Sequence, residues 1–103
     1  MQTAKISKHS WNYIVDYMDF EPDERNIYET TEENGNYLSV SVVIDGWYKV
    51  TNVEVEMWDA DGNRLEMDAD QYALLCDELD EIASNMKQEA LAEARYERWL
   101  LGA

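Results

Sequence analysis

Apolar and polar residues alternate most clearly within residues 53–86. Over residues 53–57 apolar side chains alternate with glutamates, which is the period-two pattern of a strand with one buried face. Asp61 and Gly62 then supply residues that tolerate positive φ, and this predicts a tight primed turn. The alternation resumes at residues 65–67. The pattern therefore predicts a β-hairpin.

A helix is predicted directly after this hairpin. Asp68 is a suitable N-cap and Gln71 a suitable N3 partner, so the helix is expected to begin near Ala69. At 100° per residue its apolar and acidic side chains fall on opposite sides. The apolar side holds Tyr72, Leu75, Cys76, Leu79, Ile82, Ala83 and Met86, and the opposite side holds Asp70, Asp77 and Glu81, flanked by Glu78 and Asp80. The helix thus has a core face and a carboxylate face.

Further strands are predicted upstream of residue 53. Residues 37–44 alternate strictly, a strand is expected to start near Ile27 and Tyr28, and residues 50–58 form the next strand. Turn signals at Asn34-Gly35, Asp45-Gly46 and Asp61-Gly62 separate four strands. The expected inner face of this meander consists of Leu38, Val40, Val42, Ile44, Val53, Val55, Met57, Leu65 and Met67.

The N-terminal segment is less regular. Residues 1–10 are expected to form a loose arm that leads to Ser10, a candidate N-cap, and the lone histidine, His9, is expected to be solvated because it lacks a positioned partner. Residues 11–20, WNYIVDYMDF, fit both helical and strand spacing. We favour a helix that packs on the sheet and ends before Pro22.

The C-terminal segment keeps helix-forming residues but loses the apolar stripe. Glu93 and Glu97 fall on the core side of the helix. Either the helix breaks near Ser84-Asn85 and a second one follows, or one helix continues beyond the sheet. Its apolar residues either fold back on the core or form an oligomer or docking surface. The residues of that candidate surface are Leu91, Tyr96, Trp99 and Leu100.

These elements predict the α+β fold class. The 103 residues suffice for one domain, residues 1–103, that buries roughly two-thirds of its unfolded surface. The expected architecture is a four-stranded antiparallel β-meander, with the C-terminal helix packed on one face and the aromatic N-terminal segment beside it.

The charge is the most unusual property of the chain. Twenty-three acids and eight bases give a formal net charge of −15. The negative electrostatic field of such a chain disfavours direct contact with nucleic acid or an anionic membrane, and it favours a basic protein partner. Glu54 and Glu56 are expected to protrude about 6.6 Å apart on a strand. Together with Asp70, Asp77, Glu78, Asp80 and Glu81 they form the predicted partner-binding acidic surface.

We therefore expect a non-enzymatic protein-binding module that engages a basic partner. In its sharpest form this hypothesis is a DNA-mimic inhibitor of a nucleic-acid-binding protein. The alternative is a homo-oligomeric structural or accessory protein that assembles through the C-terminal helix, a homodimer being the simplest case, with acidity serving solubility.

Several other classes are disfavoured by residue type. One cysteine, Cys76, allows no internal disulfide and no thiolate zinc site. The DADGN sequence at residues 59–63 departs from a calcium loop because glycine precedes Asn63. No catalytic set, metal site or cofactor motif is nominated. The chain shows no signal peptide or spanning segment, so a cytoplasmic location is expected.

Overall fold

The computed structural model describes residues 2–102 and has an α+β fold. A sheet is followed by one long C-terminal helix, and a short helical segment precedes the sheet. In chain order the elements are β1 (Thr3–Ala4), α1 (Lys8–Asn12), the π-helix η1 (Tyr13–Tyr17), β2 (Arg25–Thr31), β3 (Tyr37–Ile44), β4 (Val50–Trp58), β5 (Arg64–Met67) and α2 (Ala69–Leu100).

The sheet has five strands in the order β1-β5-β4-β3-β2. The predicted antiparallel meander is present as β2 to β5. The fifth strand, β1, pairs in parallel with β5. The Glu66 amide donates to the Gln2 carbonyl at 2.9 Å, and the Asp68 amide to the Ala4 carbonyl at 2.8 Å. The expectation that residues 1–10 form a loose arm is therefore wrong.

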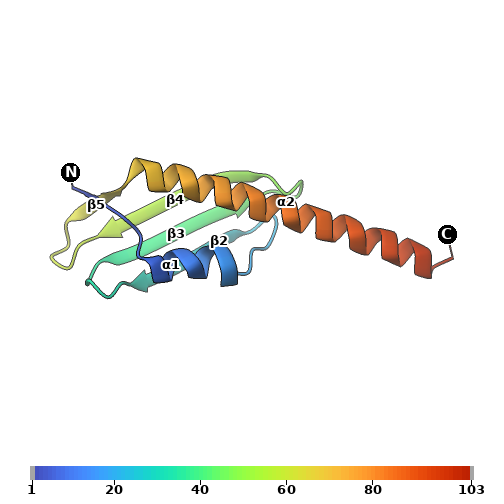
Figure 1. Cartoon of the computed structure of the whole chain (residues 1–103), viewed down its shortest axis with the longest axis horizontal. Coiled ribbons are helices and arrows are strands. Elements are labelled where there is room, and N and C mark those ends of the chain that lie inside the picture. The colour runs from blue at the N-terminus through green and yellow to red at the C-terminus, as the bar shows by residue number, and fades with distance from the viewer. Residues whose placement is uncertain (1, 103) are drawn as a thin grey trace.

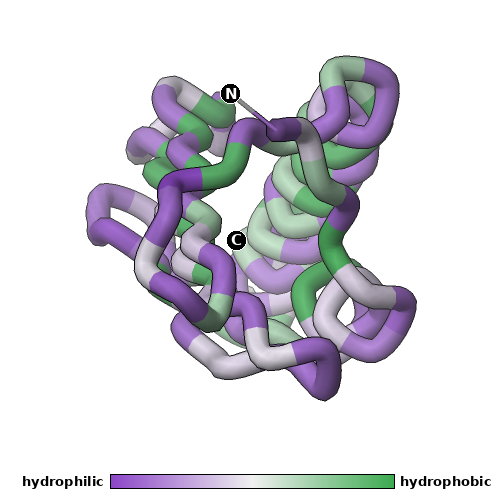
Figure 2. The backbone as a smooth tube through the Cα atoms, turned by 90° about the vertical axis from the view of Figure 1, so that its left-hand side faces the viewer, coloured by the Kyte–Doolittle hydropathy of each residue, from purple (hydrophilic) through white to green (hydrophobic). Residues whose placement is uncertain are grey.

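The helices and the sheet form two layers. Viewed along the long axis, α2 and α1 lie on the right and the strands on the left (Figure 2). In Figure 1 both helices lie in front of the sheet, α2 over β4 and α1 over β2. Within the described residues, the opposite face of the sheet carries no helix. We call it the open face.

The core lies between these layers and matches the predicted inner face. Leu38, Val40, Val42 and Ile44 of β3 are fully buried, as is Met57 of β4. Leu65 is also buried, whereas Val53, Val55 and Met67 are partly buried and pack against the core. From the helical layer, Ile14, Leu75, Leu79 and Ala83 complete it.

The N-terminal helical segment begins earlier than predicted. Ser7 is the N-cap of α1, and its Oγ accepts from the Ser10 amide at 3.2 Å. Ser10 is therefore inside the helix and buried, which corrects its assignment as N-cap. The helical option for residues 11–20 is correct as far as Tyr17, where η1 ends. Tyr13 stacks on Tyr28 of β2 at 4.7 Å between ring centroids, which fixes the segment to the sheet.

The three hairpins share one turn geometry, and it is not the predicted primed turn. In each, the amide of the first turn residue donates to the carbonyl of the residue four positions later. The fourth residue of each turn has positive φ: Gly35 at 89°, Tyr48 at 60° and Gly62 at 85°. Asp61 does not have positive φ. Each hairpin is therefore a wider loop with a single left-handed residue, in the pattern of a type I turn followed by a bulge.

Replacing Gly62 with alanine is expected to lower the free energy of unfolding by about 1–2 kcal/mol, the usual cost of a left-handed L-residue. An added Cβ would meet no atom within 4 Å, so the cost comes from the backbone alone. Urea denaturation measures it. A D-alanine at the same position, introduced by synthesis, is the matched control and is expected to keep wild-type stability. Equal stabilities of the L- and D-alanine proteins would contradict this explanation.

The long helix α2 is continuous from Ala69 to Leu100. The predicted alternative of a break near Ser84-Asn85 is therefore wrong. The second half of α2 runs past the end of the sheet (Figure 1), and the molecule measures 62 × 21 × 20 Å. Its radius of gyration is 16.7 Å, against about 13 Å for a compact chain of this length. We call residues 87–101 the arm.

Candidate binding surfaces

The acidic side chains of α2 form one exposed row on the side away from the sheet. The side chain of Asp68 caps the helix by accepting from the Gln71 amide at 3.0 Å. Gln71 in turn bonds both backbone groups of Ile6, at 2.7 and 3.1 Å. These contacts fix the rotation of α2, so that its apolar side faces the core. The outer acidic row, as we call it, consists of Asp70, Asp77, Glu78, Asp80 and Glu81, all exposed.

No base interrupts this row. Residues 69–86 contain five acids and no lysine or arginine. Along the helix axis, Asp70 and Asp77 are separated by about 10 Å, and Asp77 and Glu81 by about 6 Å. The arm, by contrast, holds three acids and three bases, so the formal net charge of −15 belongs entirely to residues 1–86.

Glu54 and Glu56 lie on a different side of the molecule. Both are exposed, and they alternate with Val53, Val55 and Met57, which face the helical layer. The two glutamates therefore project from the open face. The structure does not bring them together with the outer acidic row, because the sheet and core lie between them. The acidic surface predicted from the sequence is two separate surfaces.

The open face contains a shallow slot between β2 and β4. Two small residues of β3, Ser39 and Ser41, form its floor. Ile27 and Glu54 flank Ser41 in the strand register, and Glu29 and Glu56 flank Ser39. The slot has a volume of about 160 Å³ and is lined by Arg25, Ile27, Ser39, Ser41, Glu54 and Glu56.

Carboxylates of this face act on the tyrosine at one of its ends. Partial desolvation, and then the carboxylates of Glu29 and Glu56, raise the pKa of the Tyr37 hydroxyl at one end of the face. Trp58 lies in the same row, with the Arg64 guanidinium 5.4 Å from its ring centroid. The open face is thus acidic in its middle and aromatic at one end.

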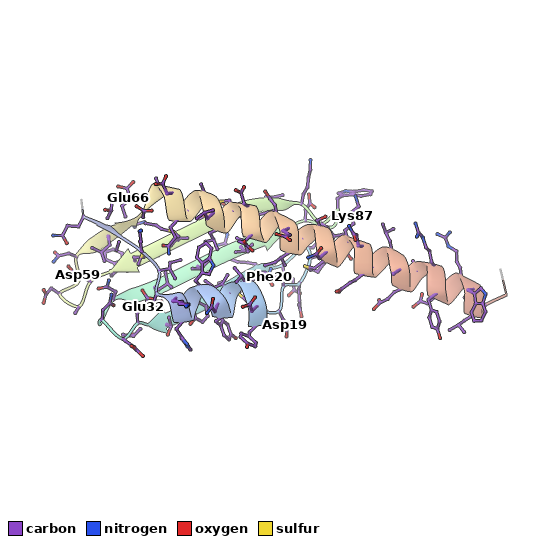
Figure 3. The ribbon with its side chains drawn as sticks, in the orientation of Figure 1. Asp19, Phe20, Glu32, Asp59, Glu66 and Lys87 are labelled. Atoms are coloured by element: carbon purple, nitrogen blue, oxygen red, sulfur yellow. The ribbon has the colours of Figure 1, made fainter. Side chains whose placement is uncertain are left out.

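The arm exposes more apolar surface than any other part of the helix. Trp99 is 74 % exposed and Leu101 is 84 % exposed, and Leu91, Tyr96 and Leu100 are also exposed. Tyr96 and Trp99 stack on each other, at 6.5 Å between ring centroids. Glu89, Ala90 and Glu93 at the start of the arm line a hollow with Met18, Phe20 and Tyr48. The last turns of α2 stand clear of the other elements (Figure 3). The arm therefore does not fold back on the core, which was one of the two predicted outcomes.

A separate hollow lies between α1 and the turn that follows β2. It has a volume of about 590 Å³, and His9 lies at its edge, exposed as expected. Glu32 is buried beside it (Figure 3), and its Oε2 accepts from the Ser7 amide at 2.7 Å. Glu32 thus helps to hold the start of α1. It was not singled out from the sequence because nothing in the local pattern shows this long-range contact.

The DADGN sequence forms a turn in which the Asp59 carboxylate already accepts hydrogen bonds from the backbone. Asp59 Oδ1 accepts from the amides of Asp61 at 3.0 Å and Asn63 at 2.8 Å. The Asn63 amide is the main cause that holds the pKa of Asp59 below its usual value. Among the described residues, no group of three or more His, Cys, Asp or Glu side chains is placed to hold a metal ion. Within residues 2–102, no helix is both long and apolar enough to cross a bilayer.

Comparison with known proteins adds no assignment. No protein-family model, curated protein or solved structure matches the chain.

Proposed function

We propose that the chain is a non-enzymatic protein-binding module whose outer acidic row engages a basic partner. The observation that carries the proposal is the concentration of negative charge in this row, with five exposed acids and no base on residues 69–86. The acids project from one rigid helix, so their spacing is fixed before binding. A basic surface that meets them needs little reordering of this chain.

The strength of such binding depends on salt. Exposed charges act through a field that falls off within about 8–10 Å at physiological ionic strength. Attraction to a basic partner is therefore expected to weaken steeply as salt rises, because most of the favourable energy is electrostatic. No base lies among the acids on residues 69–86. Lys49 and Lys87 line one hollow with Asp80 at the end of the row and reduce the attraction there.

Neutralising the outer acidic row is expected to abolish capture of basic partners from a cell lysate at low salt. The test variant carries Asp70→Asn, Asp77→Asn and Glu81→Gln. The matched control removes the same charge from exposed positions outside α2, by Glu33→Gln, Asp61→Asn and Glu66→Gln. Wild type and control should capture the same proteins at low salt and lose them at high salt. Capture of the same set by all three proteins would rule out the outer acidic row.

The sharpest form of the proposal is DNA mimicry. Carboxylates in a regular row present the sign of charge that a DNA-binding cleft recognises along a phosphate backbone. A DNA mimic competes with duplex DNA for its partner, whereas another acidic ligand leaves DNA binding intact. A competition assay with a captured partner and labelled duplex DNA therefore separates these two forms.

The exposed arm favours a second candidate function, which is self-assembly into a structural or accessory oligomer. Apolar side chains surround the last turns of α2 on several sides, and a helix with this character is normally enclosed by protein. The arm has no net charge, so two copies could meet there while their acidic domains stay apart. Sedimentation of the purified protein separates this candidate from the first, because a basic partner is not needed for assembly.

A further inference from the structure

The open-face slot has the features of a binding site for one cationic side chain. We propose that it binds the ammonium group of a lysine from the basic partner. The inference rests on the proposed function, since it assigns part of that partner's contact to a defined place. The slot combines Ser39 and Ser41 with Glu54 and Glu56. It lies on the side of the molecule opposite to the outer acidic row.

The floor of the slot supplies an unpaired acceptor. Ser41 is 8 % exposed, and its Oγ is buried with no hydrogen-bond partner in the protein. A buried hydroxyl without a partner costs free energy that a ligand can recover. Ser41 also lines the slot itself. It is therefore a second indication of a ligand, independent of the acidic residues around it.

The walls supply the charge. Glu54 stands beside Ser41 in the register, and Glu56 stands one row further along the same strand. The Asn52 side-chain amide donates to Glu54 Oε1 at 3.2 Å and so orients this carboxylate. On the other side of Ser39, Glu29 of β2 faces Glu56 across two strand spacings, or about 9.6 Å.

Size and geometry favour an ammonium group. The volume of about 160 Å³ is well below the roughly 300–1,000 Å³ of small-molecule pockets, so the slot suits a single side chain. A lysine ammonium has three donors. The two carboxylates of Glu54 and Glu56 and the hydroxyl of Ser41 provide three acceptors in one place. The guanidinium of arginine is a planar fork that pairs with one carboxylate through two parallel hydrogen bonds, so it makes less use of three acceptors that surround one point.

Arg25 limits the affinity of the slot in the isolated protein. It lines the slot from β2, one row beyond Ile27. Its positive charge repels an incoming ammonium and attracts the same carboxylates. Removing this charge should therefore strengthen lysine binding, whereas a purely structural role of Arg25 predicts no gain.

Tetralysine titrated into the full-length, isotope-labelled protein at low salt tests the inference by nuclear magnetic resonance. The amides of Ser39, Ser41 and Glu54 should shift. Glu54→Gln with Glu56→Gln should weaken binding about tenfold, in line with loss of charge-assisted hydrogen bonds. The matched control, Asp77→Asn with Glu81→Gln, removes equal charge from the opposite side and should weaken it less than twofold. Ser41→Ala should weaken it several-fold without changing the charge, and Arg25→Gln should strengthen it.

Equal weakening by the two double variants would overturn the site, because general attraction to an acidic protein predicts that result. Equal affinity for tetraarginine would overturn the assignment to an ammonium group. The amide spectrum reports folding of every variant, so a misfolded protein is recognised. If partner capture fails with the outer-row variant while the slot variant behaves like wild type in tetralysine binding, only the slot is wrong. If tetralysine binds as expected but the outer-row variant captures the same proteins as wild type, only the proposed function is wrong.

Discussion

Replacing Asn26 with alanine is expected to lower the free energy of unfolding by about 3 kcal/mol or more, since several buried groups lose their partners at once. Asn26 is buried at the start of β2. Its Oδ1 accepts from the Glu21 amide at 2.9 Å. Its Nδ2 donates to the carbonyls of Glu21, Glu24 and Val42 at 3.1–3.2 Å. One side chain thus joins the segment after η1 to the centre of the sheet.

Two further variants check this explanation in urea denaturation. Asn52→Ala removes the same side chain from a β4 position where it bonds only the exposed Glu54, and it should cost less than about 1 kcal/mol. Asn26→Asp keeps the size but replaces the donor with a carboxylate that faces carbonyl oxygens, so it should be as destabilising as alanine at neutral pH. Wild-type stability of Asn26→Asp would show that the carbonyl contacts contribute little.

Replacing Tyr96, Trp99 and Leu100 with alanine is expected to convert the assembled protein to monomers under the second candidate function. Alanine is a strong helix former, so the helix itself should persist. The three side chains are exposed and lie on the part of α2 that runs past the end of the sheet (Figure 1), so the urea midpoint of the dissociated chain should not change. Sedimentation equilibrium measures the mass before and after the change.

The control for this experiment is Leu74→Ala. Leu74 is 58 % exposed on the first half of α2, the same exposure as Leu100 on the arm. This replacement tests whether the loss of any exposed leucine of α2 dissociates the assembly. The assembly should keep its mass in the Leu74→Ala protein. A monomeric wild type, or an assembly that persists without the three arm side chains, would refute assembly through the arm.

The meander could be predicted because its strands alternate. β3 and β4 occur over the predicted residues, 37–44 and 50–58. By contrast β1 spans only two residues, too few to show a period, and its pairing with β5 joins residues that are far apart in the sequence. The turn type was missed because the side chains of Asn34, Asp45 and Asp59 accept local amides. These bonds favour a wider turn over a primed one.

The binding surfaces were predictable to different degrees. The outer acidic row follows from helical periodicity on a single element, so its residues could be named from the sequence. The slot depends on the register of β2, β3 and β4, which places Ser41 between Ile27 and Glu54. No pattern within one strand contains that information. The separation of Glu54 from the helix acids likewise required knowledge of which sheet face the helices cover.

The projecting arm also affects how the mass of the protein must be measured. The radius of gyration of 16.7 Å exceeds that of a compact chain of this length by roughly a third. An elongated monomer should therefore elute from a sizing column ahead of a compact protein of the same mass. Elution volume alone would overestimate the mass of the chain. Light scattering, which does not depend on shape in this way, avoids the error.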